Sequence, residues 1–92
     1  MRDYLLDAAR EQWPHIRGLY QSFQDKKPVM LLDMQQQRVY AYPHAAFAKE
    51  LGKRSRRSLK EQYEKAVREN KIVVFVRDNE QRKLVSYSIE YE

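Results

Sequence analysis

The residues with the clearest potential for chemistry are cations crowded into one short stretch. Five lysines and arginines fall within eight positions: Lys53, Arg54, Arg56, Arg57 and Lys60. The pattern Ser58-Leu59-Lys60-Glu61 is typical of a capping box, which predicts a helix start at Ser58. The free amides of a helix start already carry about half a positive charge. Arginines beside such amides are explained if an anion, typically a phosphate, occupies the site.

The sequence therefore predicts an anion-binding site for nucleic acid or another polyanion at residues 53–60. In this hypothesis the five cations contact phosphates, and Ser58 with the following amides forms a phosphate seat. Residues 53–71 hold eight cations and three acids, a net +5 that equals the net charge of the whole chain. A localised excess creates a potential that a charged partner can sense. Two alternatives stay open: a solvated loop whose arginines pair with nearby glutamates, or contact with an acidic protein.

Aromatic residues beside a cation form a second candidate surface. Tyr40 and Tyr42 are predicted to share one face of a strand with Arg38. Tyrosines on such a face can stack on nucleic-acid bases. The alternative is that both pack beneath a helix with their hydroxyls at its rim. The sequence lacks the aromatic-rich motif that marks an RRM sheet.

Residues for catalysis or metal binding are scarce. The chain has no cysteine, and its two histidines, His15 and His44, do not stand at metal-ligand spacing. No serine has a histidine near it in sequence, and neither of the two glycines belongs to a phosphate-loop motif. We therefore expect no enzymatic activity, no cofactor and no metal site.

The periodicity of apolar residues predicts a single α+β domain over residues 1–92. Helices are predicted at 3–25, 44–51 and 58–70, and strands at 29–34, 38–42, 72–76 and 84–91. Pro14 should kink the first helix or split it in two. We expect one four-stranded, mostly antiparallel sheet with strands 29–34 and 72–76 in its centre and the helices on one face. No repeat of 20–50 residues is evident.

The N-terminal helix carries a broad apolar surface that could cover the sheet or bind a partner. Its members are Tyr4, Leu5, Leu6, Trp13, Ile16, Tyr20 and Phe23. The leading functional hypothesis is a small non-enzymatic module that contacts nucleic acid or another polyanion through residues 53–60. The alternative is a protein-interaction or regulatory module, homodimeric in one version, that uses the apolar face of this helix or a strand edge. The chain has an acid at position 7, where a signal peptide would be apolar, and it has no run of about 20 apolar residues and no cysteine. We therefore expect a cytoplasmic protein without a membrane partner.

Overall fold

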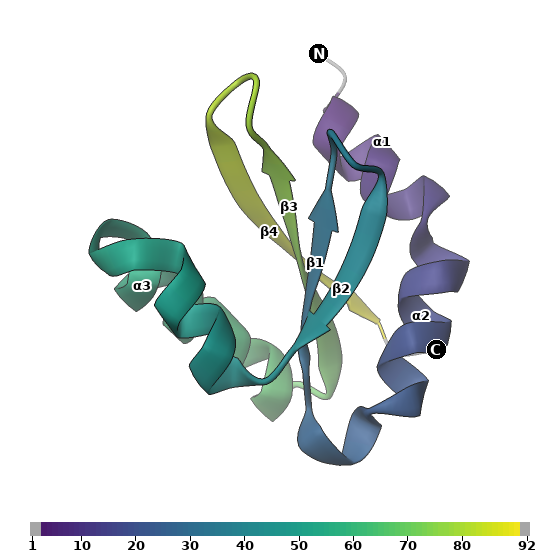
Figure 1. The fold of residues 1–92 in the computed structure, drawn as a ribbon. Helices are drawn as coiled ribbons and strands as arrows, with labels where there is room; N and C mark the ends of the chain where they lie inside the picture. The colour runs from purple at the N-terminus through teal and green to yellow at the C-terminus, as the bar shows by residue number, and fades with distance from the viewer. Residues whose placement is uncertain (1–2, 91–92) are drawn as a thin grey trace.

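The computed structural model describes residues 3–90, and within residues 44–58 it describes the side chains of 45, 46 and 49 only. The elements in chain order are α1 (Tyr4–Glu11), α2 (Trp13–Ser22), a short 3-10 helix (Gln24–Lys26), β1 (Val29–Asp33), β2 (Arg38–Tyr42), α3 (His44–Arg68), β3 (Lys71–Asp78) and β4 (Lys83–Glu90). In the described chain, three α-helices and one four-stranded sheet form a single compact domain (Figure 1). The predicted α+β class is confirmed.

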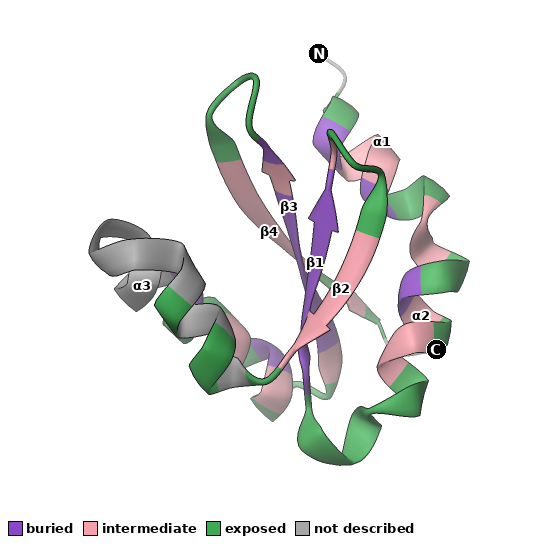
Figure 2. Ribbon diagram, in the orientation of Figure 1, coloured by how far each residue is buried: buried purple, intermediate pink, exposed green. Residues whose placement is uncertain are grey.

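The sheet has the strand order β2-β1-β3-β4, with the two most apolar strands in its centre. β1 and β3 run parallel, and each pairs antiparallel with the strand that follows it. All five residues of β1 and six of the eight in β3 are buried, as Figure 2 shows. A strand that is apolar on both faces is stable where both faces are covered. The predicted central positions of strands 29–34 and 72–76 are therefore confirmed.

The N-terminal helical segment is split in two beside Pro14. Asp3 caps α1, because its Oδ1 accepts hydrogen bonds from the backbone N–H groups of Leu5 and Leu6 at 3.1 and 3.2 Å. α2 begins at Trp13, so Pro14 lies in the first helical turn, where its missing N–H removes no hydrogen bond. Of the two predicted forms, kinked or split, the structure has the split form.

Helices cover both faces of the sheet, which corrects the expectation that they share one face. One core cluster joins α1 and α2 to the sheet and contains Leu5, Ala9, Ile16, Met30, Leu32, Ile72, Val74 and Val76. The other joins α3 to the opposite face and contains Val29, Leu31, Leu59, Ala66, Val73 and Phe75. Neighbouring residues of β1 and β3 alternate between the two clusters, as side chains of a strand must. The two-sided apolar character of these strands was thus the signal for two covered faces.

One helical element, α3, stands where two helices were predicted, and it begins after Pro43 and not at Ser58. A straight helix of 25 residues would be about 36 Å long. Its flanking residues Tyr42 and Lys71 nevertheless lie toward the same end of the sheet, on strands β2 and β3, about 10 Å apart across the sheet. α3 therefore cannot be a straight rod. The side chain of Ser58 lies outside the described residues.

The chain builds the same unit twice: a helical segment, then a hairpin whose first strand enters the centre of the sheet. Each helical segment is followed by a residue with positive φ, Lys27 and Asn70, just before that strand. Asp33 and Asp78, 45 positions apart, end the two central strands. Because the two units also cover opposite faces of the sheet, an approximate two-fold axis along β1 and β3 relates them. No sequence repeat indicated this symmetry.

Candidate functional site

The predicted anion site falls largely outside the described side chains. These undescribed side chains are Lys53, Arg54, Arg56, Arg57 and Ser58. Lys60 is described and is exposed on α3, as are Lys49, Lys65 and Arg68. The excess positive charge thus belongs to the sequence of α3, and the anion site remains a prediction.

Tyr40 and Tyr42 form a cluster with Arg38 on β2, on the face that α3 covers. The ring centroids of the tyrosines are 5.9 Å apart and their planes are tilted by 34°. The guanidinium carbon of Arg38 lies 5.9 Å from the Tyr40 centroid, and the Tyr40 hydroxyl donates to Gln36 Oε1. Both rings are half-buried against the core cluster that contains Phe75. This packing places both rings against the core; base stacking and a position beneath a helix both remain predictions.

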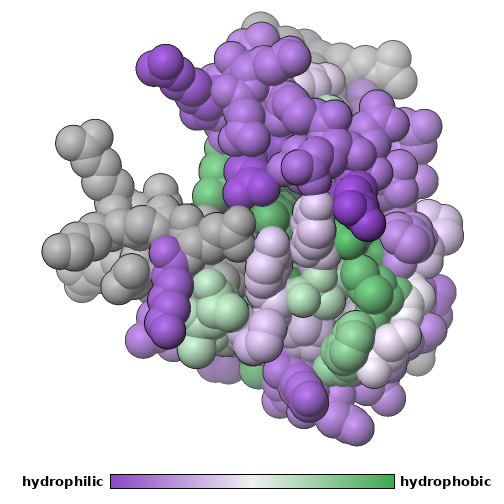
Figure 3. All heavy atoms as spheres, in the orientation of Figure 1, coloured by the Kyte–Doolittle hydropathy of each residue, from purple (hydrophilic) through white to green (hydrophobic). Residues whose placement is uncertain are grey.

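A polar network closes the end of the sheet toward which β1 and β3 point, and Figure 3 shows hydrophilic residues gathered there. Asp33 and Asp78 are buried, and each accepts hydrogen bonds from two backbone N–H groups of its own turn at 3.0–3.3 Å. Asp33 also pairs with Arg77 at 2.8 Å. Asp78 accepts hydrogen bonds from the Tyr4 hydroxyl and from Gln35 Nε2, both at 2.7 Å.

These contacts lower the pKa of both carboxyl groups. For Asp78 the largest cause is the hydrogen bond from Tyr4, which also raises the pKa of the tyrosine. Burial raises the pKa of Asp33, but the hydrogen bond and charge of Arg77, with the turn amides, outweigh it. Asp78 thus joins α1 to both hairpin turns through Tyr4 and Gln35, and Asp33 joins β1 to β3 through Arg77. Sequence reasoning missed this network, although aspartates at strand ends before polar turns were its signal.

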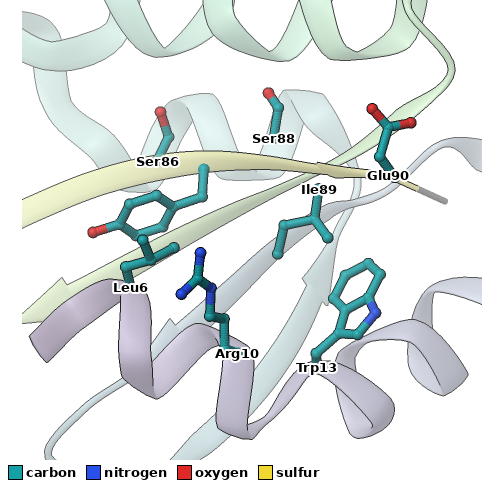
Figure 4. A pocket seen from close by; sticks show the side chains of 8 residues that line it. Leu6, Arg10, Trp13, Ser86, Ser88, Ile89 and Glu90 are labelled. Carbon is teal, nitrogen blue, oxygen red and sulfur yellow. The ribbon is translucent and has the colours of Figure 1, made fainter. Parts of the chain in front are cut away.

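A groove lies between the N-terminal helices and the edge strand β4. Its volume is about 720 Å³. Leu6 and Arg10 of α1 and Trp13 at the start of α2 form one wall, and Tyr87 and Ile89 of β4 form the other. In Figure 4 the side chains of Ser86, Ser88 and Glu90 point to the opposite side of β4. The groove is therefore bounded by four large apolar or aromatic side chains, one guanidinium and the backbone of β4.

The edge of β4 leaves backbone groups available for pairing. In the part of the chain that the structure describes, β4 pairs with β3 alone. Every second residue of an edge strand directs its N–H and C=O away from its single partner. Five residues of β4, 86–90, line the groove, a length of about 14–17 Å. A polypeptide segment of about five residues could therefore lie along this edge.

Arg10 is the one positively charged residue among the described residues that line the groove, and its guanidinium points toward β4 (Figure 4). No hydrogen bond or ion pair joins this guanidinium to any residue that the structure describes. The other charged lining residue, Glu90, points away and pairs with Lys71 at 3.5 Å. Among the residues that the structure describes, the groove thus carries one positive charge that no carboxylate pairs with.

The alternative functional hypothesis named the apolar face of the N-terminal helix and a strand edge separately. The structure brings these two features side by side and adds Arg10, which sequence reasoning did not single out. Leu6, Arg10 and Trp13 stand at i, i+4 and i+7, the spacing of one helical face. A cation inside an otherwise apolar stripe was therefore the available signal.

Among the residues with described positions, no group of three or more histidine, aspartate or glutamate side chains could hold a metal ion. No described helix is both long enough and apolar enough to span a bilayer. Comparison of the chain with models of known protein families gave no match, and neither did comparisons with curated proteins and with solved structures.

Proposed function

We propose that the protein is a non-enzymatic interaction module that binds an extended segment of another polypeptide in the groove beside β4. The observation that carries this proposal is the edge of β4 lying next to an apolar groove. A segment that pairs with β4 would satisfy its outward N–H and C=O groups with main-chain hydrogen bonds. Such strand addition gives affinity from the backbone and specificity from pockets for alternate side chains.

The walls of the groove supply the pocket for side chains. Leu6, Trp13, Tyr87 and Ile89 are all half-buried, so each leaves apolar surface toward the groove. A volume of about 720 Å³ lies within the range of about 300–1,000 Å³ that is usual for binding pockets. Every second side chain of a bound strand would point toward α1 and α2, because strand side chains alternate. The expected ligand therefore has apolar residues at alternate positions.

A peptide-display selection tests the proposal. Random eight-residue segments are selected on the protein, and the enriched peptides are synthesised and titrated while the fluorescence of Trp13, the single tryptophan of the chain, is followed. We expect enriched peptides with alternating apolar residues and a change in Trp13 emission on binding. Amide chemical-shift changes on the unmodified protein should be largest in β4 and smallest in β2, the opposite edge.

Two matched substitutions on the same strand locate the binding face. Ile89→Arg places a charge in the groove, whereas Ser88→Arg places it on the opposite side of β4 (Figure 4). Binding should be lost in Ile89→Arg and kept in Ser88→Arg. The proposal is wrong if no peptide is enriched, if both variants bind alike, or if the chemical-shift changes centre on β2. The shift measurement needs no substitution, so a poorly folded variant cannot hide this result.

A further inference from the structure

We infer that the segment bound in the groove presents a carboxylate to Arg10, an inference that rests on the proposed function. The guanidinium lies inside the groove, and no described residue compensates its charge. The partner that fits it is an anionic group placed among apolar neighbours.

Arg10 is an exposed residue, and two ion pairs in the described part of the chain serve as a comparison for it. Arg77 donates to Asp33 at 2.8 Å, and Lys71 pairs with Glu90 at 3.5 Å. Arg10 belongs to neither pair, although it lines the groove. A guanidinium presents a planar set of donors that matches the two oxygens of a carboxylate. The apolar walls lower the local dielectric once a ligand fills the groove, which strengthens that pairing.

The position of Arg10 also fixes what the carboxylate must be attached to. Leu6 lies one turn before Arg10 and Trp13 almost one turn after it, so apolar surface flanks the guanidinium on both sides. A small free anion would leave that surface exposed to water. A carboxylate carried on an extended segment would cover it with the neighbouring side chains. This carboxylate is either an aspartate or glutamate side chain or the C-terminus of the bound polypeptide.

Four pentapeptides distinguish these sources and test the inference. All share the acetylated sequence Val-Thr-Val-Thr, which places the valines and the fifth side chain on one face of the strand, and they end in leucine with a free carboxylate, leucine amide, glutamate amide or glutamine amide. Binding is followed by Trp13 fluorescence and by the NMR signal of the Arg10 side-chain N–H. We expect the free acid or the glutamate amide to bind about 2- to 5-fold more tightly than its uncharged counterpart, as for an exposed ion pair. The pair that shows the preference identifies the source.

Arg10→Gln should abolish this preference and leave the affinity for the uncharged peptides unchanged. Arg82→Gln is the matched control: Arg82 is exposed in the β3–β4 turn, and Gln37 adopts nearly the same positive φ at the corresponding turn position. The preference should persist in Arg82→Gln and shrink with added salt. If charged and uncharged peptides bind alike and Ile89→Arg abolishes both, the groove function stands and the carboxylate inference falls. If none of the four shifts any resonance of the groove at millimolar concentration, both fall.

Discussion

The two separate core clusters predict which core substitutions act independently. Phe75 is fully buried in the cluster beneath α3, and Met30 is fully buried in the cluster beneath α1 and α2. Phe75→Leu removes three carbons from a closed site, which should lower the free energy of unfolding by about 2 kcal/mol. For a domain of this size that corresponds to a fall in Tm of roughly 8–16 °C. Urea unfolding monitored by Trp13 fluorescence and by circular dichroism measures the change.

A pair of double-mutant cycles completes this prediction. Leu59→Ala affects the same cluster as Phe75, so the two substitutions should couple by about 0.5–3 kcal/mol. Met30→Val lies across the sheet from the Phe75 side chain, so its effect should add to that of Phe75→Leu within about 0.5 kcal/mol. A loss below about 1 kcal/mol for Phe75→Leu, or equal coupling in both cycles, would refute the two-cluster description.

Further predictions concern pH, polyanions and assembly. The pKa values of Asp3, Asp33 and Asp78 are lowered in the folded state. Their stabilising contribution is therefore present above the unfolded pKa of about 3.9 and is lost as the pH falls through the folded values. We expect the free energy of unfolding, measured by urea titration, to drop between about pH 5 and pH 2. If residues 53–60 bind nucleic acid, Arg56→Glu/Arg57→Glu should weaken binding at low salt, and log K should fall linearly with log salt; unchanged affinity contradicts that hypothesis. If the groove takes a foreign segment and not a second copy of this chain, light scattering at two concentrations should give the mass of one chain at both; a dimer would identify the second copy as the occupant.

Patterns of apolar residues predicted the strands because the residues of a strand indicate by their own polarity whether its faces are buried. Residues 29–32 and 72–76 are apolar without interruption, and only the centre of a covered sheet accommodates such runs. Pro14 likewise predicted a break, since its chemistry is local. The same patterns were compatible with helices on one face of the sheet or on both. The structure decides between them, because Met30 packs with α1 and α2 whereas its neighbour Leu31 packs with α3.

The groove could not be predicted from the sequence because it depends on how far α1 and α2 reach across the sheet. Leu6 and Ile89 are 83 positions apart, and no local pattern connects them. Arg10 looked like an ordinary surface cation, since a sequence does not show whether a nearby acid reaches it. The capping-box pattern at Ser58 was misleading for a related reason: such a pattern is compatible with a helix start but does not require one, and α3 is helical on both sides of it.

The approximate two-fold axis has a consequence for how the chain can be divided. Each half owns a complete hairpin, and the halves meet in the sheet through the single parallel pair β1–β3. A cut at Pro43 would therefore leave two fragments whose exposed edges are complementary. The two-fold rotation that relates these two unlike halves is the same operation that relates two identical subunits in a symmetric dimer. The domain therefore has the architecture of a two-fold symmetric dimer, with the two halves joined in one chain.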